Sequence, residues 1–267
     1  MRYCTVLHTM RETMKQKIRL LLTDHNKGSW NMAVDEAVLE AVATGKQLPT
    51  LRLYGWSPSA VTLGYFQSLQ EEVDVRACQQ NNVAVIRRIT GGGAVFHDKE
   101  ITYSFIIPED HGMIVKDILQ SYRQISQGVI DGLKEFGLAT TFVPINDLII
   151  GGKKVSGNAQ TRKQKTILQH GTVLLDVNVR SMFSLLKVSD EKIRDKMITA
   201  VEDRVTSLKQ QLGREVSFVD VQNALINGFG AAFDADFVVS VLSSEERQRA
   251  EIIEREKYTA DTWNGMR

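Results

Sequence analysis

Residues Arg87–Asp98 read RRITGGGAVFHD, in which two arginines end a β-branched run and three consecutive glycines follow. Three glycines in a row disfavour both helix and strand, so the segment predicts a loop whose main chain something approaches closely. Its backbone N–H groups can donate to anionic oxygens, and arginine supplies a permanent charge for phosphate or carboxylate. The pattern is neither a Walker A loop nor a Rossmann glycine signature. Taken alone, it fits a glycine-rich hairpin bend with exposed arginines equally well.

The composition of the 267-residue chain is that of an ordinary globular protein. With 43% hydrophobic and 24% charged residues, it excludes disordered, collagen-like and coiled-coil classes. A formal net charge of +1 argues against a protein whose main task is to grip nucleic acid or an anionic membrane. The two cysteines, Cys4 and Cys78, cannot build a disulfide framework or a zinc site alone. No apolar run approaches the roughly 18 to 20 residues of a membrane helix, so we expect a cytoplasmic protein.

The N-terminal residues 1–17 mix charged and apolar side chains without the continuous apolar stretch of a signal peptide. We expect a loosely ordered extension there. The remainder, residues 18–267, is expected to form one catalytic domain whose C-terminal portion is helical from about residue 215. A boundary near residues 210–215 is only weakly signalled.

Hydrophobic spacing separates strand-like from helix-like segments along the chain. Strands are expected at 18–22, 51–54, 60–64, 83–88, 101–107, 141–143, 147–150, 154–156 and 167–176. Helices are expected at 29–43, 114–136, 179–187, 190–199, 219–229 and 243–258. Strands in meanders and helices in separate blocks favour an α+β fold with mixed or antiparallel sheets over a doubly wound fold.

A second motif, Asn146–Gln160 (NDLIIGGKKVSGNAQ), predicts a strand, a glycine turn and a second strand that begins with lysine. Strand alternation places Lys154 and Ser156 on one face and Lys153 on the other, so the two lysines cannot share one role. The ordinary explanation of such a lysine is a solvated edge residue that discourages strand aggregation.

A third motif, Gln169–Asp176 (QHGTVLLD), places His170 at a probable strand. His170 and His97 have no clustered partners in the sequence, so neither indicates a metal site, and each alone is best explained as a structural histidine. Cys78 lies in a charged segment expected to be helical, where an inert or exposed thiol is the simplest interpretation.

Together, the three motifs resemble the biotin/lipoate protein ligase superfamily, and its lipoate–protein ligase branch most closely. Further similarity lies in residues 31–40 (NMAVDEAVLE), 51–67 (LRLYGWSPSAVTLGYFQ) and 204–208 (RVTSL), and the resemblance extends in order from about residue 18 to 267. It implies a class II biotin/lipoyl synthetase-like α+β domain, in which helices cover a mixed sheet that holds an acyl adenylate.

The activity implied by this resemblance is that of a lipoate–protein ligase. ATP with Mg²⁺ would convert lipoate or octanoate to acyl-AMP, and a lysine of an apo lipoyl-domain carrier would then attack the acyl carbon. The implied carriers are the glycine cleavage H protein and the E2 subunit of a 2-oxoacid dehydrogenase. Many relatives carry a further accessory domain after this core, so a separate accessory subunit is a further expected partner; nucleic acid and membranes are not.

The resemblance also implies the site residues. Lys154 matches the essential lysine of the family, which bridges the acyl carboxylate and the α-phosphate, and Asp147 is the candidate magnesium contact. The expected substrate- and nucleotide-binding residues are Arg88, Gly91, Gly92, Gly93, Ala94, Val95, Phe96, His97, Asn146, Ser156, Gly157 and His170.

Two alternatives stay open. Octanoyltransferases of the same superfamily share this short length and move an acyl group between carrier proteins through a cysteine thioester, without ATP. Their cysteine lies just before the strand that begins here at Asp147, whereas this chain has no cysteine after Cys78. This hypothesis therefore requires Cys78 to approach Lys154. The third hypothesis is a non-catalytic module that binds an acyl group or a carrier protein.

Overall fold

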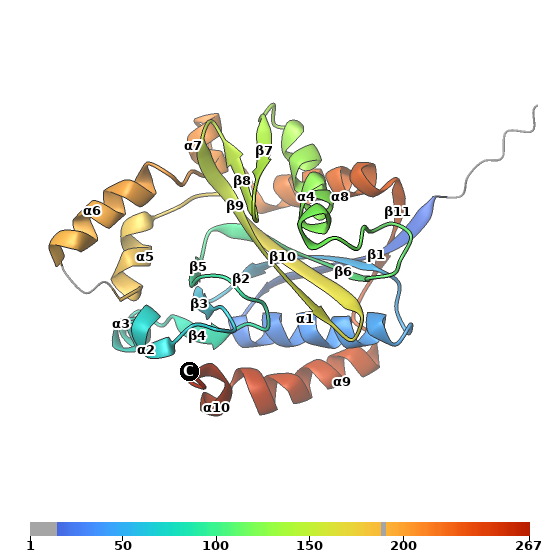
Figure 1. Ribbon diagram of the computed structural model, residues 1–267, viewed down its shortest axis with the longest axis horizontal. Helices are drawn as coiled ribbons and strands as arrows, with labels where there is room; N and C mark the ends of the chain where they lie inside the picture. Colours follow the sequence, from blue (N-terminus) through green and yellow to red (C-terminus); the bar gives the residue numbers. More distant parts are fainter. Residues whose placement is uncertain (1–14, 188–190) are drawn as a thin grey trace, which may run out of the picture.

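An eight-stranded mixed sheet crosses the computed structural model, which describes residues 15–187 and 191–267 (Figure 1). The strand order is β11-β1-β2-β6-β10-β9-β8-β7, with β11, β1 and β2 parallel and every other neighbouring pair antiparallel. The bounds are β1 Gln16–Asn26, β2 Thr50–Trp56, β6 Glu100–Pro108, β7 Thr140–Val143, β8 Asp147–Ile150, β9 Lys153–Lys163, β10 Thr166–Leu174 and β11 Ala235–Ser240.

Helices cover both faces of this sheet (Figure 1). On one face, α1 (Gly28–Ala43) packs beside α9 (Ser244–Ile253) and its π-helical continuation η1 (Glu254–Tyr258). On the other face, α4 (Ile118–Lys134) crosses α8 (Phe218–Phe233). The shorter helices are α2 Leu69–Glu72, α3 Val75–Gln80, α5 Val179–Leu185, α6 Glu191–Glu202, α7 Leu208–Leu212 and α10 Asp261–Asn264. The α+β class predicted from the sequence is confirmed.

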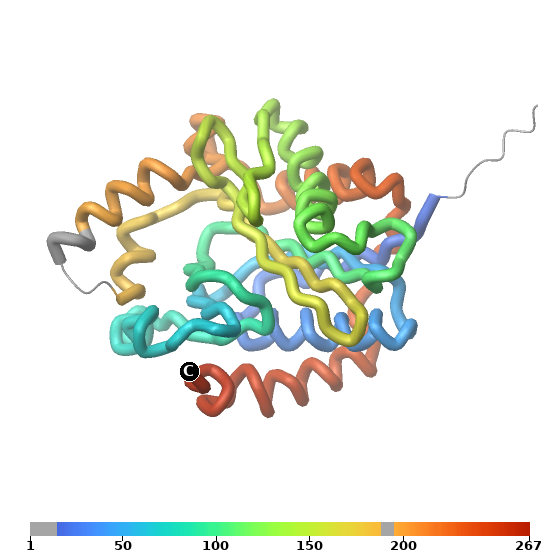
Figure 2. The backbone as a smooth tube through the Cα atoms, viewed as in Figure 1, coloured from blue at the N-terminus to red at the C-terminus, as the bar shows by residue number. Residues whose placement is uncertain are grey.

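Side-chain alternation along β6 explains why two cores form. Phe105 and Ile107 join the core under α4 and α8, whereas Ile106 between them joins the core under α1 and α9. Figure 2 shows that the first helix and the last helices of the chain lie together, although they are far apart in sequence. Ion pairs join them on the solvent side, between Arg249 and Glu40 and between Lys257 and Glu36.

A small three-stranded sheet carries the glycine-rich segment. Its order is β4 (Ala84–Arg87), β3 (Ala60–Leu63) and β5 (Val95–His97), so residues 88–94, here called the glycine loop, connect the two edges across the end of β3. A Cβ atom on Gly64 would lie 1.9 Å from the carbonyl oxygen of Gly92. The loop therefore packs directly on the backbone that follows β3, which only a glycine permits.

Several boundaries differ from the sequence predictions. The strand expected at 154–156 extends as β9 from Lys153 to Lys163, and the short strand β5 was not expected. The strand β1 begins at Gln16, because Gln16 and Lys17 pair with Ala235 and Asp236, so the expected extension is shorter; its residues 1–14 lie outside the described part of the chain. The C-terminal portion contains the strand β11, which its parallel partner β1 stabilises from the far end of the sequence. Helix α4 begins only at Ile118, where the carboxylate of Asp117 accepts from the backbone N–H of Gln120.

The hydrophobic core extends across the possible domain boundary that the sequence weakly indicates near residues 210–215. Leu225 and Phe229 of α8 belong to the same buried cluster as Phe105 of β6, so α8 is part of the main core. Among the described residues, no helix is both long enough and apolar enough to cross a membrane.

Candidate functional site

A cavity of about 300 Å³ lies between the glycine loop, β9 and the end of β10, and is here called the central cavity. Its apolar lining includes Trp56, Phe96, Leu174, Val179 and Met182. Most of the predicted site residues also line it, namely Arg88, Gly92, Gly93, Ala94, Val95, Phe96, His97, Asn146, Lys154, Gly157 and His170. Gly91, Asp147 and Ser156 are not among the lining residues. Three motifs far apart in sequence thus meet at one site.

Lys154 stands on the β9 wall of the central cavity. Its ammonium Nζ lies 2.6 Å from Oδ1 of Asp147, and the two side chains are 40% and 36% exposed. The backbone N–H of Lys154 donates to the carbonyl of Arg204 at 2.7 Å, and its carbonyl accepts from the N–H of Thr206 at 2.8 Å. The RVTSL segment therefore holds the main chain of Lys154 and leaves its ammonium at the cavity.

A β-bulge explains why Ser156 is misplaced in the sequence prediction. Ile149 pairs with Lys154, but the preceding residue, Leu148, pairs with Ser156, so β9 carries one extra residue, Val155, at this point. The bulge moves Gly157 to the face of Lys154 and buries Ser156. A Cβ on Gly157 would lie 2.8 Å from Cε of Lys154, so the glycine leaves room for the lysine side chain.

The neighbouring Lys153 points elsewhere, and its ammonium donates to the carbonyl of Glu202 at 3.2 Å. Lys153 does not line the central cavity. The two lysines therefore have different surroundings.

Arg88 holds the glycine loop from inside. Its Nε donates to Thr90 Oγ1, its Nη1 donates to the carbonyl and the hydroxyl of Thr62, and its Nη2 donates to the carbonyls of Gly91 and Gly93, all within 2.7–3.1 Å. A guanidinium has five N–H donors, so all of them are used within the protein. The side chain is buried, and this burial lowers its pKa to about 10. Arg88 therefore shapes the loop and has no donor left for a ligand.

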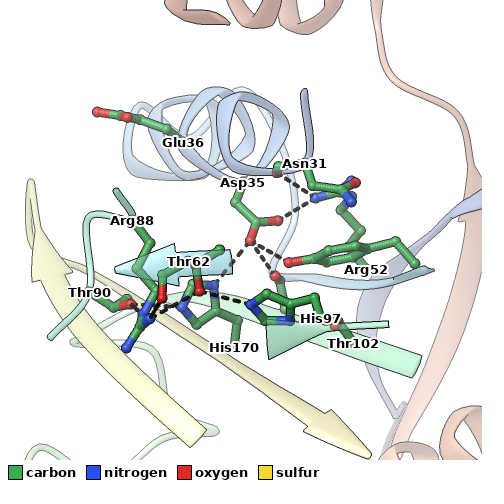
Figure 3. Close-up of polar contacts among 12 residues, drawn as sticks. Asn31, Asp35, Glu36, Arg52, Thr62, Arg88, Thr90, His97, Thr102 and His170 are labelled. Carbon is green, nitrogen blue, oxygen red and sulfur yellow. Dashed lines mark hydrogen bonds and ion pairs between the residues drawn. The ribbon is translucent and has the colours of Figure 1, made fainter. Parts of the chain in front are cut away.

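A chain of buried polar side chains links this loop to helix α1 (Figure 3). The hydroxyl of Thr90 lies 2.7 Å from Nε2 of His170, whose Nδ1 lies 3.3 Å from Oδ2 of Asp35. Arg52 donates to Oδ1 of Asp35 at 2.6 Å. Burial raises the pKa of Asp35, but the charge of Arg52 and the hydrogen bond from His170 outweigh it, so the pKa lies below its usual value.

Burial also determines the charge of His170. It lowers the pKa of the ring, against the opposing hydrogen bond and charge of Asp35, so the imidazole is neutral at pH 7. A neutral ring that donates from Nδ1 to Asp35 leaves Nε2 free to accept from the Thr90 hydroxyl. The four-residue chain is then satisfied at every step.

His97 lines the same cavity and contacts the hydroxyl of Thr62, as Arg88 does. Its Nδ1 lies 2.7 Å from Oε1 of Glu100, its Nε2 lies 2.8 Å from the hydroxyl of Thr62, and its ring stacks on Trp56 at 3.9 Å between centroids. The second carboxylate oxygen of Glu100 is buried and has no hydrogen-bond partner within the described ranges. Glu100 itself lines the cavity, so this acceptor is one of the polar groups of its lining.

Sequence reasoning missed Asp35, Arg52, Glu100 and Thr62. Asp35 lies among the apolar positions of a helix that the sequence does predict, and an acidic residue on such a face is itself a signal of a buried partner. The partner, Arg52, comes from a separate strand, so its pairing with Asp35 depends on the tertiary structure.

A metal site does not assemble around Asp147. Over residues 15–187 and 191–267, no group of three or more His, Cys, Asp or Glu side chains is arranged to hold a metal ion. The observed partner of the Asp147 carboxylate is the ammonium of Lys154. These residues do not fit a protein-built magnesium site.

Cys78 does not meet Lys154. It lies on α3, packed among Val61, Leu63, Val73 and Leu185, and lines no part of the central cavity. Burial raises its pKa to about 11, so thiolate is scarce at neutral pH. Of the two interpretations from the sequence, the inert thiol fits. Cys4 lies outside the described residues.

Comparison with known proteins places this site in a family. The family model of the lipoyl protein ligase A/B catalytic domain matches residues 27–230. Octanoyltransferase LipM from Kyrpidia tusciae is 37% identical to the chain, and the match covers 93% of this chain and 98% of the relative. Further relatives with the same name are 33 to 36% identical.

Two solved structures are similar over nearly the whole chain. A bipartite lipoate protein ligase from Thermoplasma acidophilum matches with a TM-score of 0.86 and 32% identity, covering 94% of this chain and 98% of that one. A lipoate–protein ligase A bound with ATP matches with a TM-score of 0.80 and 28% identity, covering 95% and 100%. The resemblance and the fold inferred from the sequence are confirmed.

The main activity inferred from the sequence is nevertheless wrong. The curated relatives are named as octanoyltransferases, which contradicts the prediction of an ATP-dependent ligase and favours the alternative that the sequence left open. The expected acyl-adenylate intermediate and its ATP belong to the ligase hypothesis, and the names of these relatives do not support them. The prediction was wrong because it required the transferase to have a cysteine just before β8, and this chain has no cysteine after Cys78.

Proposed function

The chain belongs to the lipoyl protein ligase A/B catalytic-domain family, and on this premise we propose that it transfers an octanoyl group between carrier proteins without ATP. The donor is an octanoylated acyl carrier protein, and the acceptor is the lysine of an apo lipoyl-domain protein. The observation that carries the proposal is the central cavity, which is largely apolar and has the ammonium of Lys154 on one wall. A lipoyl group, with a similar apolar chain, is the second acyl candidate.

The cavity lining suits an octanoyl chain. Trp56, Phe96, Leu174, Val179 and Met182 offer apolar surface, and each buried CH₂ contributes roughly 0.8 kcal/mol. The glycine loop adds wall without side chains, so the acyl chain can lie close to its backbone. The bonds from Arg88 keep that wall in one conformation before the substrate arrives.

The chemistry requires no ATP, because the donor is a thioester and its acyl carbon is already electrophilic. The acceptor amine attacks this carbon, a C–N bond forms, the C–S bond breaks, and the proton released by the amine is taken up by the departing thiolate. The negative charge that develops on the acyl oxygen is stabilised by the ammonium of Lys154. Asp147 holds that ammonium at the cavity, and Gly157 leaves space for it.

The buried position of Cys78 leads us to propose direct transfer, with no acyl-cysteine intermediate on the enzyme. Cys78 lines no part of the central cavity, and its raised pKa disfavours a nucleophilic thiolate. A single site that binds donor and acceptor together replaces the two-step route through a cysteine. This proposal gives Lys154 an electrostatic role in place of the activation of a thiol.

The test mixes the purified chain with octanoyl acyl carrier protein and an apo lipoyl domain, either from an E2 subunit or as the glycine cleavage H protein. We expect the acceptor to gain one octanoyl group by intact-mass spectrometry in the absence of ATP. A second reaction supplies free octanoate, ATP and Mg²⁺. Acceptor modification in the second reaction alone would contradict the proposal, and octanoate binding without modification in either would favour a non-catalytic module.

A further inference from the structure

A second, larger cavity of about 990 Å³ adjoins the central cavity, and we call it the polar groove. The two cavities meet along a common stretch of lining residues, namely Trp56, Phe96, Asp98, Lys99, Asp176, Val177, Asn178, Val179 and Val205. The outer side of the groove is formed by the turn between β2 and β3, the residues before β4, and helix α5. The function proposed above uses Trp56, Phe96 and Val179 on the shared stretch, and leaves the rest of the groove without a role.

The lining of the polar groove is rich in neutral groups that form hydrogen bonds. They are Ser57, Ser59, Asn81, Asn82, Asn178, Ser181, Ser184 and Gln210. The side chains of Asn82 and Ser181 donate to and accept from no other residue in the described part of the chain, so both are available to a ligand. This composition contrasts with the apolar lining of the central cavity.

The charged residues of the groove are paired with groups of the protein. Lys99 lies 3.6 Å from Asp176, Arg180 lies 3.7 Å from Glu202, and the hydroxyl of Ser59 donates to Asp98 at 2.7 Å. The depth of the groove therefore suits a long neutral chain that carries amides. At the rim, the side chains of Arg180 and Lys99 are 72% and 67% exposed. Exposed pairs of this kind are weak, so either cation can turn to an anionic ligand at little cost.

We propose that the polar groove binds the phosphopantetheine arm of the donor carrier protein. The arm is a neutral chain with two amides and a hydroxyl, it ends in the thioester, and a phosphodiester joins it to the carrier. Its amides would meet Asn82 and Ser181, its phosphodiester would meet Arg180 at the rim, and its thioester end would enter the central cavity beside Lys154. This inference rests on the proposed transferase function.

The acceptor lysine is a poorer occupant of the groove. A lysine side chain is a short hydrocarbon with a cationic end, so it needs a narrow apolar passage and an unpaired acid. The acids of the groove, Asp98, Asp176 and Glu202, already have partners, and the space is wide. The acceptor therefore approaches Lys154 by another route.

The test compares donors that carry more or less of the arm. They are octanoyl acyl carrier protein, octanoyl-pantetheine, and octanoyl-N-acetylcysteamine, which keeps only the end of the arm. Ser181→Trp fills the groove, and Gln79→Trp, on the exposed side of α3 outside the groove, is the matched control. We expect Ser181→Trp to lower kcat/KM for the carrier donor at least about tenfold more than for the shortest donor, since two or more hydrogen bonds are lost.

A charge variant tests whether Arg180, at the rim of the groove, contacts the phosphodiester of the donor. Arg180→Gln should raise KM for the carrier donor several-fold relative to octanoyl-pantetheine, which lacks the phosphate. The proposal is overturned if Ser181→Trp affects all three donors equally, or if it raises KM for the acceptor lipoyl domain and leaves that of the donor unchanged. The Gln79→Trp control should not change the ratio between donors.

A binding measurement separates this inference from the proposed function. Calorimetric titration with 4′-phosphopantetheine should give heat with the unchanged protein and much less with Ser181→Trp. If no donor supports transfer, the transferase proposal fails, and the titration alone then decides whether the groove binds the arm. Absence of binding to the unchanged protein, alongside active transfer, would overturn the groove assignment and keep the transferase.

Discussion

Two cations that border the central cavity, Arg88 and Lys154, are in opposite states. Arg88, on the glycine-loop wall, is 5% exposed and directs every donor to Thr62, Thr90 and the loop carbonyls. Lys154, on the β9 wall, has a side chain 40% exposed, and its ammonium is paired with Asp147. Both are basic residues beside glycines in the sequence. The difference shows that burial and donor use separate a cation that builds a wall from one that can act at it.

The largest effect is expected from removing the available cation. Lys154→Ala should lower kcat/KM for acyl transfer by about 10²–10³, because an oxyanion loses its stabilising donor. The fold should persist, since the side chain is partly exposed and its main-chain bonds to Arg204 and Thr206 remain. Transfer rate and thermal midpoint are measured together. Lys153→Ala is the control, and full activity of Lys154→Ala would remove the basis of the comparison.

Arg88→Lys should mainly lower the stability of the fold, and its effect on the transfer rate should follow from the loss of the loop conformation. A lysine keeps the charge but has three donors on a flexible stem, so it cannot replace a fork of five N–H bonds. We expect a loss of about 2–4 kcal/mol in the free energy of unfolding, measured by denaturant titration, because buried carbonyls lose their partners. Arg214→Lys, at an exposed position, is the control. Equal stability of the two variants would show that Arg88 does not hold the loop.

The buried ring of His170, which contacts Thr90 of the glycine loop, makes the stability of the protein depend on pH. Its folded-state pKa is depressed, so the unfolded chain binds the proton more tightly, and stability falls as pH drops below the usual histidine value of 6.5. The expected slope is at most about 1.4 kcal/mol per pH unit for this one proton. His170→Gln should flatten the stability curve between pH 7 and 5.5. An unchanged slope, measured by thermal unfolding, would contradict the buried neutral ring.

The smallest effect is expected at Cys78. Cys78→Ala, combined with Cys4→Ala, should leave the transfer rate within about a factor of two, because neither thiol is proposed to carry the acyl group. Stability should fall by about 1 kcal/mol from the lost packing around Cys78. Intact-mass spectrometry after incubation with octanoyl donor alone should show no acylated protein. Acylation of the unchanged chain that disappears in the double variant would replace direct transfer by a cysteine route.

Much of the fold could be predicted from the sequence, because local spacing determines most of its elements. The apolar periods of α1 and α4, the alternating strands and the order of the three motifs identify an α+β ligase-like domain. Besides short helices such as α2 and α10, two features that were missed depend on distant partners. β11 is held by β1 from the other end of the chain, and the bulge in β9 is a property of its pairing with β8.

The sequence by itself determined which residues gather at the site: the glycine loop, Lys154 and His170 are recognisable as motifs, and they line one cavity. Only the tertiary structure decided what each does there. In the folded chain, Arg88 donates to the carbonyls of the glycine loop and His170 contacts Asp35. Cys78 lies in a separate core. The physical reason is that hydrogen-bond use and burial are set by neighbours far along the chain, whereas a motif records only residue type and local spacing.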